Sequence, residues 1–398
     1  MSLGISILGL AGLVLIHELG HFLVARATGM SPRRFYLGFP PAIVKVRRKG
    51  IEYGIGAIPL GGYVKIPGMH RPAPSDLAAA FGRAVEERPR LGRVVDRLNR
   101  LVGGGEMDDA RRVLPELESE VAEERLSEPA RRAAERGLNE LRDGLGDDAY
   151  WRQRTWKKVA VIFAGPAANL LVALALFTGL LMQDAWQIGV RLQAAPDNAA
   201  TTRIEEVLPG TPAQNAGLRA GDRVVAINGT PVSARRLLDM IAASTGRPLQ
   251  LTVRRGPGTV VTVLAAERRG GLSLPAAIGR SSQITWRVTE EIALFFPRLA
   301  TGEGASEVSS PVGIAQVSSE ALDQSFSDFV FVLGLISLSL ALLNLLPLLP
   351  LDGGHIAFSI IEGVRGRALG RELYERVSVI GIAFVLVLFV IGLSNDVG

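Results

Sequence analysis

The stretch Ile5–Ala27 reads ISILGLAGLVLIHELGHFLVARA, and the organisation of the rest of the chain follows from it. Its length matches a membrane-crossing helix, which needs roughly 20 predominantly apolar residues. Inside it, His17, Glu18 and His21 form the pattern H-E-x-x-H. On a helix the two histidines lie one turn apart on the same face, so both imidazoles can bind one zinc ion. Glu18 lies between them, where it can take a proton from a zinc-bound water.

Ionisable side chains inside such a helix indicate a function. By insertion scales, each one costs about 2.5 kcal/mol or more at the bilayer centre, so it is seldom present without a role. The alternative is that the pattern arises by chance, or that the histidines only pack against neighbouring helices. The sequence contains no cysteine, which leaves histidine and carboxylate side chains as the ligands for zinc.

The composition predicts a membrane protein rather than an ordinary soluble enzyme. The chain has 398 residues, of which 48% are hydrophobic, and its mean hydropathy is +0.26. Four segments are long and apolar enough to cross a bilayer, and these are residues 5–27, 157–182, 329–349 and 377–394.

The positions of the basic residues predict how the chain crosses the membrane. They are concentrated in the connections 28–156 and 361–376, whereas both chain ends lack them. Because cytoplasmic loops carry the excess of lysine and arginine, both termini should face outward and these two connections should be cytoplasmic. The segment between the second and third spans should then lie outside, although it carries arginines of its own, because long domains are translocated regardless of charge. The net charge of +5 is carried largely by arginine, much of it near the expected membrane edges. That pattern indicates membrane topology and not nucleic-acid binding. The expected location is the plasma (inner) membrane.

After the first span the sequence favours β-strands. Residues 42–46 and 51–55 alternate apolar and polar side chains around a turn, which is typical of a hairpin. An apolar, glycine-rich strand follows at 58–66. The edge of a strand beside a membrane site can pair with an extended substrate through backbone hydrogen bonds, whereas a plain cytoplasmic hairpin is the alternative. On the first of these two interpretations, the substrate-binding residues of the strand are Gly61, Gly62 and Tyr63.

Residues 70–150 change in character, because charged residues become dense and aromatic residues become rare. Leucine and valine recur here at spacings of three and four, which favours helices at 77–102, 108–124 and 129–141. We expect a small cytoplasmic helical insertion in which no catalytic chemistry is recognisable.

The second span opens with FAGPAAN, which ends at Asn169. The small residues Gly165, Ala167 and Ala168 let helices approach one another closely. Asn169 is polar inside an apolar segment and should face the helix bundle. There it either packs against a neighbouring helix or supports the active site from behind.

Residues 187–269 have the composition of a soluble module. Short β-rich runs alternate with two helix candidates, and the runs are residues 203–207, 223–227, 249–254 and 260–264. The motifs Gly217-Leu218-x-x-Gly221-Asp222 and Ile227-Asn228-Gly229 resemble those of a bacterial PDZ domain. PDZ domains bind extended C-terminal peptides along a sheet edge. The alternative is a lid that binds nothing.

The region of the third span is interrupted. It ends in NLLPLLPLDGGH, from Asn344 to His355, in which two prolines end or kink the helix. Freed carbonyl groups at membrane depth need partners, which a polar cavity can supply. The residues that we expect to shape this loop are Pro347, Gly353 and Gly354.

Asp352 should reach the level of His17 and His21 and supply the third zinc ligand, which leaves the fourth position for water. His355 is the competing ligand. Asn344 can hydrogen-bond a substrate backbone or a developing oxyanion.

The expected fold class is a polytopic α-helical membrane protein with four transmembrane helices, a membrane-associated β-hairpin region and an extracytoplasmic α+β PDZ domain. Residues 282–300 are amphipathic and should lie on the outer membrane surface. The expected parts of the chain are 1–30, 31–69, 70–150, 151–184, 187–269, 282–300, 325–360 and 374–395.

These motifs, in this order, resemble the site-2 protease family of intramembrane zinc metalloproteases. They are HELGH, PLGGYVK, AGPxxN, the PDZ module and NxxP…LDGGH, and they cover nearly the whole chain except 70–150. The resemblance implies Zn²⁺ as the cofactor, with His17, His21 and Asp352 as ligands and Glu18 as general acid and base. The chain departs from the usual family pattern in two ways. It carries the insertion at 70–150, and it has a single PDZ module where several relatives carry two.

The same resemblance implies the substrates. Family members cleave single-pass membrane proteins, often anti-sigma factors that another protease has already trimmed outside, or signal-peptide remnants. Asn344 would contact the substrate and the Gly61-Gly62 strand would clamp it. The expected function is therefore a zinc-dependent metalloendopeptidase acting within the membrane, with membrane lipid as a further partner and no nucleic acid.

Two rival functions are a catalytically silent PDZ adaptor and a metal transporter. An adaptor gains nothing from buried ionisable groups. A transporter should carry further acidic residues in its other spans, which the sequence lacks.

Overall fold

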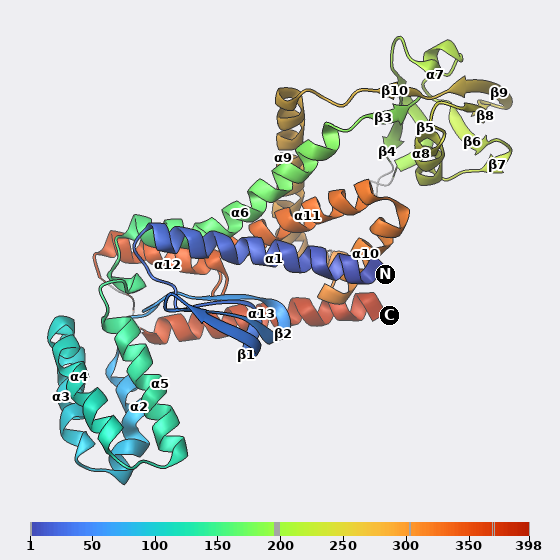
Figure 1. Ribbon diagram of the computed structural model, residues 1–398. Coiled ribbons are helices and arrows are strands. Elements are labelled where there is room, and N and C mark those ends of the chain that lie inside the picture. The colour runs from blue at the N-terminus through green and yellow to red at the C-terminus, as the bar shows by residue number, and fades with distance from the viewer. Residues whose placement is uncertain (1, 195–199, 302–303, 368, 370, 398) are drawn as a thin grey trace. The chain divides into compact units, whose positions relative to one another are not determined.

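The structure is a computed structural model that describes residues 2–194, 200–301, 304–367, 369 and 371–397. It contains two compact units, one made of Met1–Leu176 with Ile284–Gly398 and the other of Phe177–Gln283. The larger unit carries the H-E-x-x-H helix, the hairpin and the helical insertion, and the smaller one is rich in strands (Figure 1).

Four helices among the described residues are long and apolar enough to cross a membrane. They are α1 (Ser2–Ala27), α6 (Thr155–Leu181), α11 (Phe326–Asn344) and the part Leu373–Asp396 of α13 (Arg371–Val397). Their apolar windows have mean hydropathies of 1.9 to 2.8, yet only 11% to 39% of each window is buried inside the protein. Surfaces so apolar and so little covered suit contact with lipid, because soluble proteins rarely leave apolar patches of this extent open.

The third apolar segment is a broken helix, as its two prolines indicated. α11 ends at Asn344, inside the expected span 329–349, because the position before a proline disfavours helical geometry. The chain turns through residues 345–351 and then starts α12 (Asp352–Arg365). Gly354 permits this tight turn, since a β-carbon there would lie 2.5 Å from the amide nitrogen of Leu349. The turn brings the predicted carboxylate ligand to the start of α12.

β1 (Arg34–Arg48) and β2 (Ile51–Lys65) form an antiparallel hairpin that packs against α1. Residues 34–37 pair with 52–55 on one side and with 62–65 on the other, because β2 bends back across them. The sequence predicted the hairpin and the glycine-rich strand. It did not predict that the start of β1 would lie between them as a central strand.

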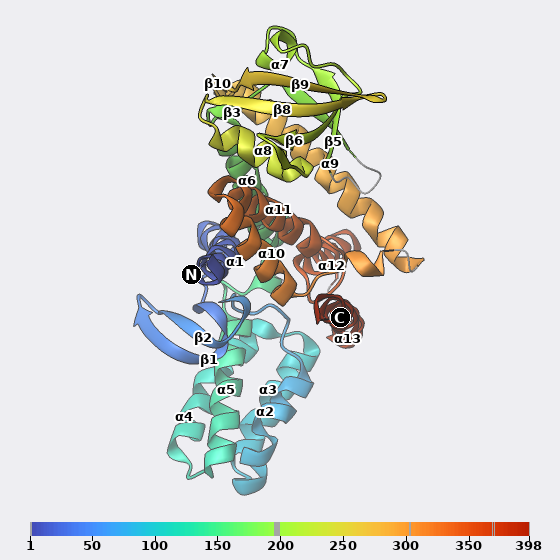
Figure 2. The same cartoon turned by 90° about the vertical axis from the view of Figure 1, so that its right-hand side faces the viewer.

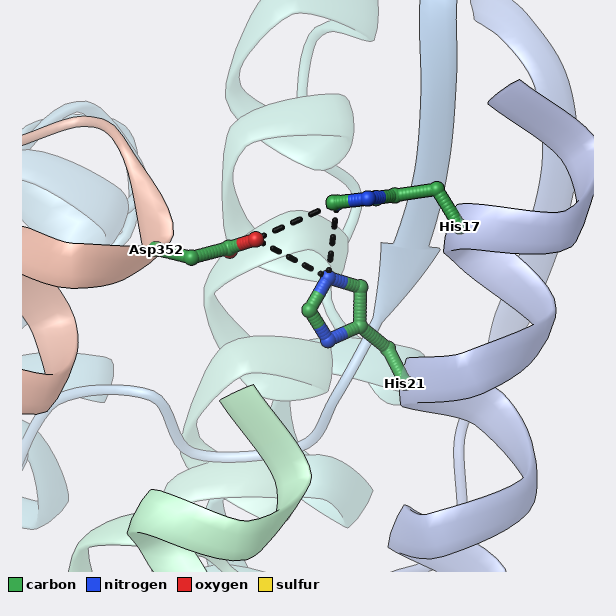
Figure 3. A group of neighbouring side chains, drawn as sticks. All are labelled: His17, His21 and Asp352. Carbon is green, nitrogen blue, oxygen red and sulfur yellow. Dashed lines mark hydrogen bonds and ion pairs between the residues drawn. The ribbon is translucent and has the colours of Figure 1, made fainter. Parts of the chain in front are cut away.

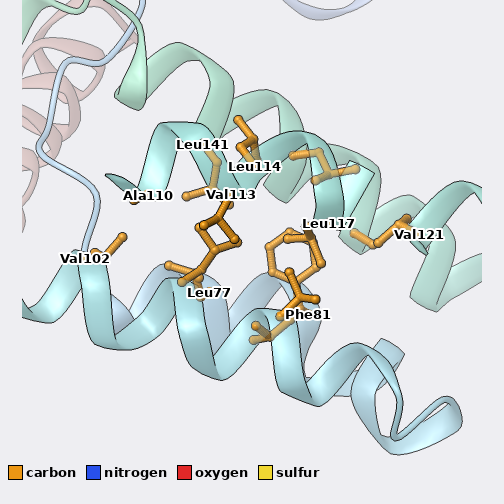
Figure 4. Close-up of a cluster of buried hydrophobic side chains, with 14 of the residues drawn as sticks. Leu77, Phe81, Val102, Ala110, Val113, Leu114, Leu117, Val121 and Leu141 are labelled. Atoms are coloured by element: carbon orange, nitrogen blue, oxygen red, sulfur yellow. The ribbon is translucent and has the colours of Figure 1, made fainter. Parts of the chain in front are cut away.

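The insertion is a bundle of four helices with its own hydrophobic core (Figures 2 and 4). The helices are α2 (Pro74–Glu87), α3 (Leu91–Gly104), α4 (Met107–Glu123) and α5 (Glu128–Leu145), and the short helix η1 (Tyr150–Arg152) follows. The single helix expected over 77–102 was wrong, because Pro89 separates α2 from α3. The core includes Phe81, Leu98 and Leu117, which are fully buried.

The smaller unit is built on an antiparallel sheet in the order β4-β5-β6-β8-β9, with β7 paired to β6 (Figure 1). Its strands are β3 (Ala185–Gln187), β4 (Val190–Ala194), β5 (Ala200–Val207), β6 (Arg223–Ile227), β7 (Thr230–Pro231), β8 (Pro248–Arg255), β9 (Gly258–Ala265) and β10 (Glu267–Arg269). Two short helices, α7 (Pro212–Asn215) and α8 (Ala234–Ala243), lie between these strands in the sequence. Strands occur where all four β-rich runs were expected.

A buried ion pair ties the motif loop of this unit to its sheet. The Asp222 carboxylate is 1% exposed and accepts hydrogen bonds from Arg255 Nε at 2.8 Å and Nη2 at 2.7 Å. It also accepts one from the Arg219 amide at 2.8 Å. The hydrogen bonds from Arg255 lower the pKa of Asp222 below its ordinary value, against the opposing effect of burial.

Three further helical elements precede α11. The amphipathic segment expected at 282–300 is part of a longer helix, α9 (Leu274–Ala300), so its predicted start was too late. η2 (Ala305–Glu307) and α10 (Pro311–Gln324) follow. The sequence did not predict α10, which packs against α1, α11 and α13.

Candidate metal centre

Three side chains from distant parts of the chain converge at one point (Figure 3). His17 and His21 project from the same face of α1, and Asp352 projects from the first turn of α12. The Asp352 Oδ2 atom lies 3.1 Å from His17 Nε2 and 3.3 Å from His21 Nε2. The two Nε2 atoms are 3.2 Å apart. No other group of three such ligands lies this close among the residues that the structure describes.

These distances fit a zinc ion. With bonds of about 2.0–2.1 Å, the ligand atoms of a tetrahedral zinc site lie about 3.3 Å from one another. Both histidines are 7% exposed, and the side chain of Asp352 is 16% exposed. Two imidazole nitrogens and one carboxylate oxygen are the donor set of a catalytic zinc site, in which the fourth position stays open.

A backbone contact fixes the orientation of His21. Its Nδ1 atom donates a hydrogen bond to the Val161 carbonyl of α6 at 2.9 Å. The proton is therefore on Nδ1, and the lone pair of Nε2 points toward Asp352. Metal-binding histidines generally use such a second contact to fix both tautomer and ring angle.

Asn169 is placed to fix the orientation of the His17 ring. It is fully buried, and its side-chain Nδ2 atom lies 3.4 Å from His17 Nδ1. A metal-binding Nε2 requires the proton of His17 on Nδ1, so the amide should present its oxygen there. Asn169 Oδ1 is buried and has no other partner among the described residues, and the two ends of an amide are assigned from such networks. This geometry favours the supporting role over packing alone.

Glycines make room for the centre. A β-carbon at Gly165 would overlap the His21 imidazole and lie 2.8 Å from His17 Nε2. A β-carbon at Gly20 would lie 3.1 Å from the Gly165 nitrogen, so α1 and α6 are in backbone contact here. The sequence indicated close helix packing at Gly165, but not that this residue borders the metal ligands.

Glu18 lies against the glycine-rich strand. A β-carbon at Gly62 would be 2.9 Å from the Glu18 carboxyl carbon, so the strand passes directly over the predicted base. Gly61 has a φ of +127°, which favours glycine. Tyr63 is half-buried and pairs with Tyr36 of β1.

The structure does not bring every predicted residue into the centre. The Asn344 side chain donates to the Leu340 carbonyl of its own helix at 2.9 Å. His355, the competing ligand, is not in the convergent group. Pro347 lies in the turn between α11 and α12, and Gly353 packs against the backbone of Leu345 in that turn. Their roles stay predictions.

Comparison with known proteins supports a protease. The model of peptidase family M50 matches residues 5–388. The chain is 29% identical to "Probable protease eep" of Enterococcus faecalis, over 97% of this chain and 96% of that protein. It is 29% identical to the zinc metalloprotease RasP of Geobacillus kaustophilus, over 97% of this chain and 95% of that protein. It is 28% identical to the zinc metalloprotease Rip1 of Mycobacterium tuberculosis, over 91% of this chain and 86% of that protein.

Among solved structures, the PDZ domain of HtrA3 bound to a phage-derived ligand is 30% identical to part of the chain. The match covers 22% of this chain and 91% of that domain, with a TM-score of 0.19.

Proposed function

The chain belongs to peptidase family M50, the site-2 proteases, and is a zinc-dependent metalloendopeptidase; we propose that it hydrolyses peptide bonds within the membrane-spanning segments of single-pass proteins. The observation that carries this proposal is the convergence of Asp352 with His17 and His21, which lie within a helix apolar enough to span a membrane.

The ligand residues would hold zinc, which supplies Lewis-acid polarisation of the scissile carbonyl and acidifies water. Asp352 and the two imidazoles would position it, while the Val161 carbonyl and Asn169 would hold the imidazole rings. Glu18, one residue from His17, takes the proton of the attacking water and then gives one to the departing amine. Gly62 keeps that carboxylate beside the strand without a side chain between them.

A helical substrate must unwind before attack, because its amides are hydrogen-bonded within the helix. Residues 62–65 of β2 pair with β1 along one edge. We assign the other edge of this strand, which adjoins Glu18 at Gly62, to backbone pairing with the extended substrate. Such pairing offsets the loss of the substrate's own helical hydrogen bonds.

The proposed substrates are anti-sigma factors or signal-peptide remnants whose outer domain another protease has already removed. The PDZ-like unit and α9 are proposed to lie outside the cell (plasma) membrane, together with both termini, and to exclude substrates with large outer domains. Deletion of residues 187–269 should then allow untrimmed substrates to be cut. Continued protection of those substrates would show that the unit is no filter.

The test of the proposed chemistry is Glu18→Gln, with zinc content and cleavage of a single-pass reporter measured on the same preparation. The variant should keep one zinc per chain and lose cleavage, because the amide cannot accept the proton. Wild-type cleavage by this variant would show that Glu18 is not the base.

A further inference from the structure

A cavity with charged side chains in its lining lies in the larger unit, where the helical insertion joins the apolar helices. Its volume is about 410 Å³, within the range of small-ligand sites. It is bounded by both ends of the insertion, the first turn of α6, the end of α12 and the start of α13, and none of the three metal-binding residues lines it. We name it the stem pocket, and its polar lining includes Arg71, Tyr150, Thr155, Lys158, Glu362 and Arg367.

The charges of the stem pocket favour an anion. Arg71, Lys158 and Arg367 are cationic, whereas Glu362 is the one carboxylate among the lining residues. Glu362 is committed to Lys158, whose Nζ atom lies 3.2 Å away. Neither arginine makes an ion pair with a carboxylate in the part of the chain that the structure describes, although the Arg71 guanidinium lies 5.7 Å from the Trp151 ring centroid. Both arginines are exposed residues that line the pocket, and neither has a carboxylate counter-ion among the described residues.

The geometry of the pocket suits a phosphate group. The side chain of Lys158 is only 9% exposed and is held between Glu362 and the Tyr150 ring. Thr155 is the first residue of α6 and also lines the pocket, so the positive end of a helix dipole adjoins the cationic side chains. Arginine guanidinium groups bind phosphate oxygens through paired hydrogen bonds.

The surroundings of the pocket favour a lipid as the source of that phosphate. Trp156 at the start of α6 is 60% exposed, as is typical of aromatic residues at a membrane interface. Ile361 and Val364 of α12 are 43% and 84% exposed, which provides apolar surface next to the pocket. The basic connections that flank it are those expected in the cytoplasm, where the leaflet is rich in anionic lipids.

We propose that the stem pocket binds the phosphate headgroup of an anionic phospholipid of the cytoplasmic leaflet. The headgroup would join the insertion to α6 and α12, which already meet through a 3.0 Å contact between the Tyr150 hydroxyl and the Ser359 hydroxyl. α12 carries Asp352 at its other end. A lipid in the pocket thus stabilises the position of the helix that bears the third metal ligand.

The test uses full-length protein in a zwitterionic detergent, with Glu18→Gln so that binding is independent of peptide hydrolysis. The probes are dioctanoyl phosphatidylglycerol, dioctanoyl phosphatidylcholine and glycerol 3-phosphate, and binding is followed by calorimetry. Arg71→Gln with Arg367→Gln removes the two unpaired cations. Arg154→Gln with Arg365→Gln removes two exposed charges that do not line the pocket, and serves as the matched control.

We expect saturable binding of phosphatidylglycerol at least about tenfold tighter than that of phosphatidylcholine. Arg71→Gln with Arg367→Gln should weaken phosphatidylglycerol binding at least about tenfold, and the control pair should weaken it by less than about twofold. Equal binding of the two lipids, or equal weakening by both variants, would overturn the site. Glycerol 3-phosphate binding as tightly as phosphatidylglycerol would overturn the lipid assignment and show a site for soluble phosphate esters.

Discussion

Replacement of Gly165 by alanine should remove the metal centre while leaving the fold intact. Gly165 lies in α6 directly behind the ligands, and a β-carbon there would overlap His21 and lie 2.8 Å from His17 Nε2. A non-bonded contact to carbon needs about 3.5 Å. The His17 ring would therefore have to retreat by about 0.7 Å, and the His21 ring by more.

Metal coordination does not tolerate such shifts. Ligand distances in a working site stay within about 0.2 Å of their ideal values, and disturbing only the supporting contacts already costs about 10- to 100-fold in affinity. We therefore expect Gly165→Ala to weaken zinc binding by about 100-fold or more. Its thermal stability without metal should not fall, because alanine favours a helix by about 1 kcal/mol over glycine.

Gly179→Ala is the matched control, since it lies in the same helix and its β-carbon would meet nothing within 4 Å. Zinc per chain is measured at a series of buffered free-zinc concentrations, beside cleavage of a single-pass reporter. The control should behave as wild type. If Gly165→Ala bound zinc with wild-type affinity, the described position of α6 against the two imidazoles would be wrong.

Three further predictions follow from the same geometry. Gly62→Ala should keep zinc but lower cleavage about 100-fold, because its methyl group displaces Glu18; unchanged cleavage would refute the contact. Asn169→Leu should weaken zinc binding about 10- to 100-fold and Asn169→Asp should restore much of it, as measured by zinc competition, whereas equal losses in both would indicate packing alone. In the smaller unit, Asp222→Asn should destabilise β6 by about 1.5–3 kcal/mol at pH 7, measured by hydrogen exchange. The pKa of Asp222 is lower in the folded protein than in the unfolded chain. Its contribution to the free energy of unfolding is therefore complete above the unfolded pKa of about 3.9, and is lost as the pH falls through the lower folded value. If the stability of the Asp222→Asn variant fell with acid as much as that of wild type, this explanation would be contradicted.

The metal ligands were the part of the site most accessible to sequence reasoning. The spacing of His17 and His21 fixes their common face through helix geometry alone. Asp352 could be inferred because a carboxylate follows two prolines in an otherwise apolar segment. The structure then brings it within 3.3 Å of both imidazoles.

Other features of the site depend on tertiary contacts that leave no recognisable pattern in the local sequence. Gly165 borders the ligands only because α1 and α6 touch through their backbones. Asn344 was expected to face the substrate, but its side-chain amide donates a hydrogen bond to the Leu340 carbonyl of its own helix. Backbone carbonyls of the same helix compete for such side chains, and composition does not reveal this competition. The division of α2 from α3 could have been predicted, since Pro89 lacks the amide hydrogen that a continuous helix needs.

The most direct test of the metal centre is zinc K-edge X-ray absorption on the purified full-length protein, compared between wild type and Asp352→Ala. In wild type the zinc should have two imidazole nitrogen ligands and additional oxygen ligands, all at about 2.0–2.2 Å from the metal. The Asp352→Ala variant should lose one oxygen ligand or the metal itself. A zinc shell that is the same in both proteins, or one without two imidazoles, would contradict the proposed coordination by His17, His21 and Asp352.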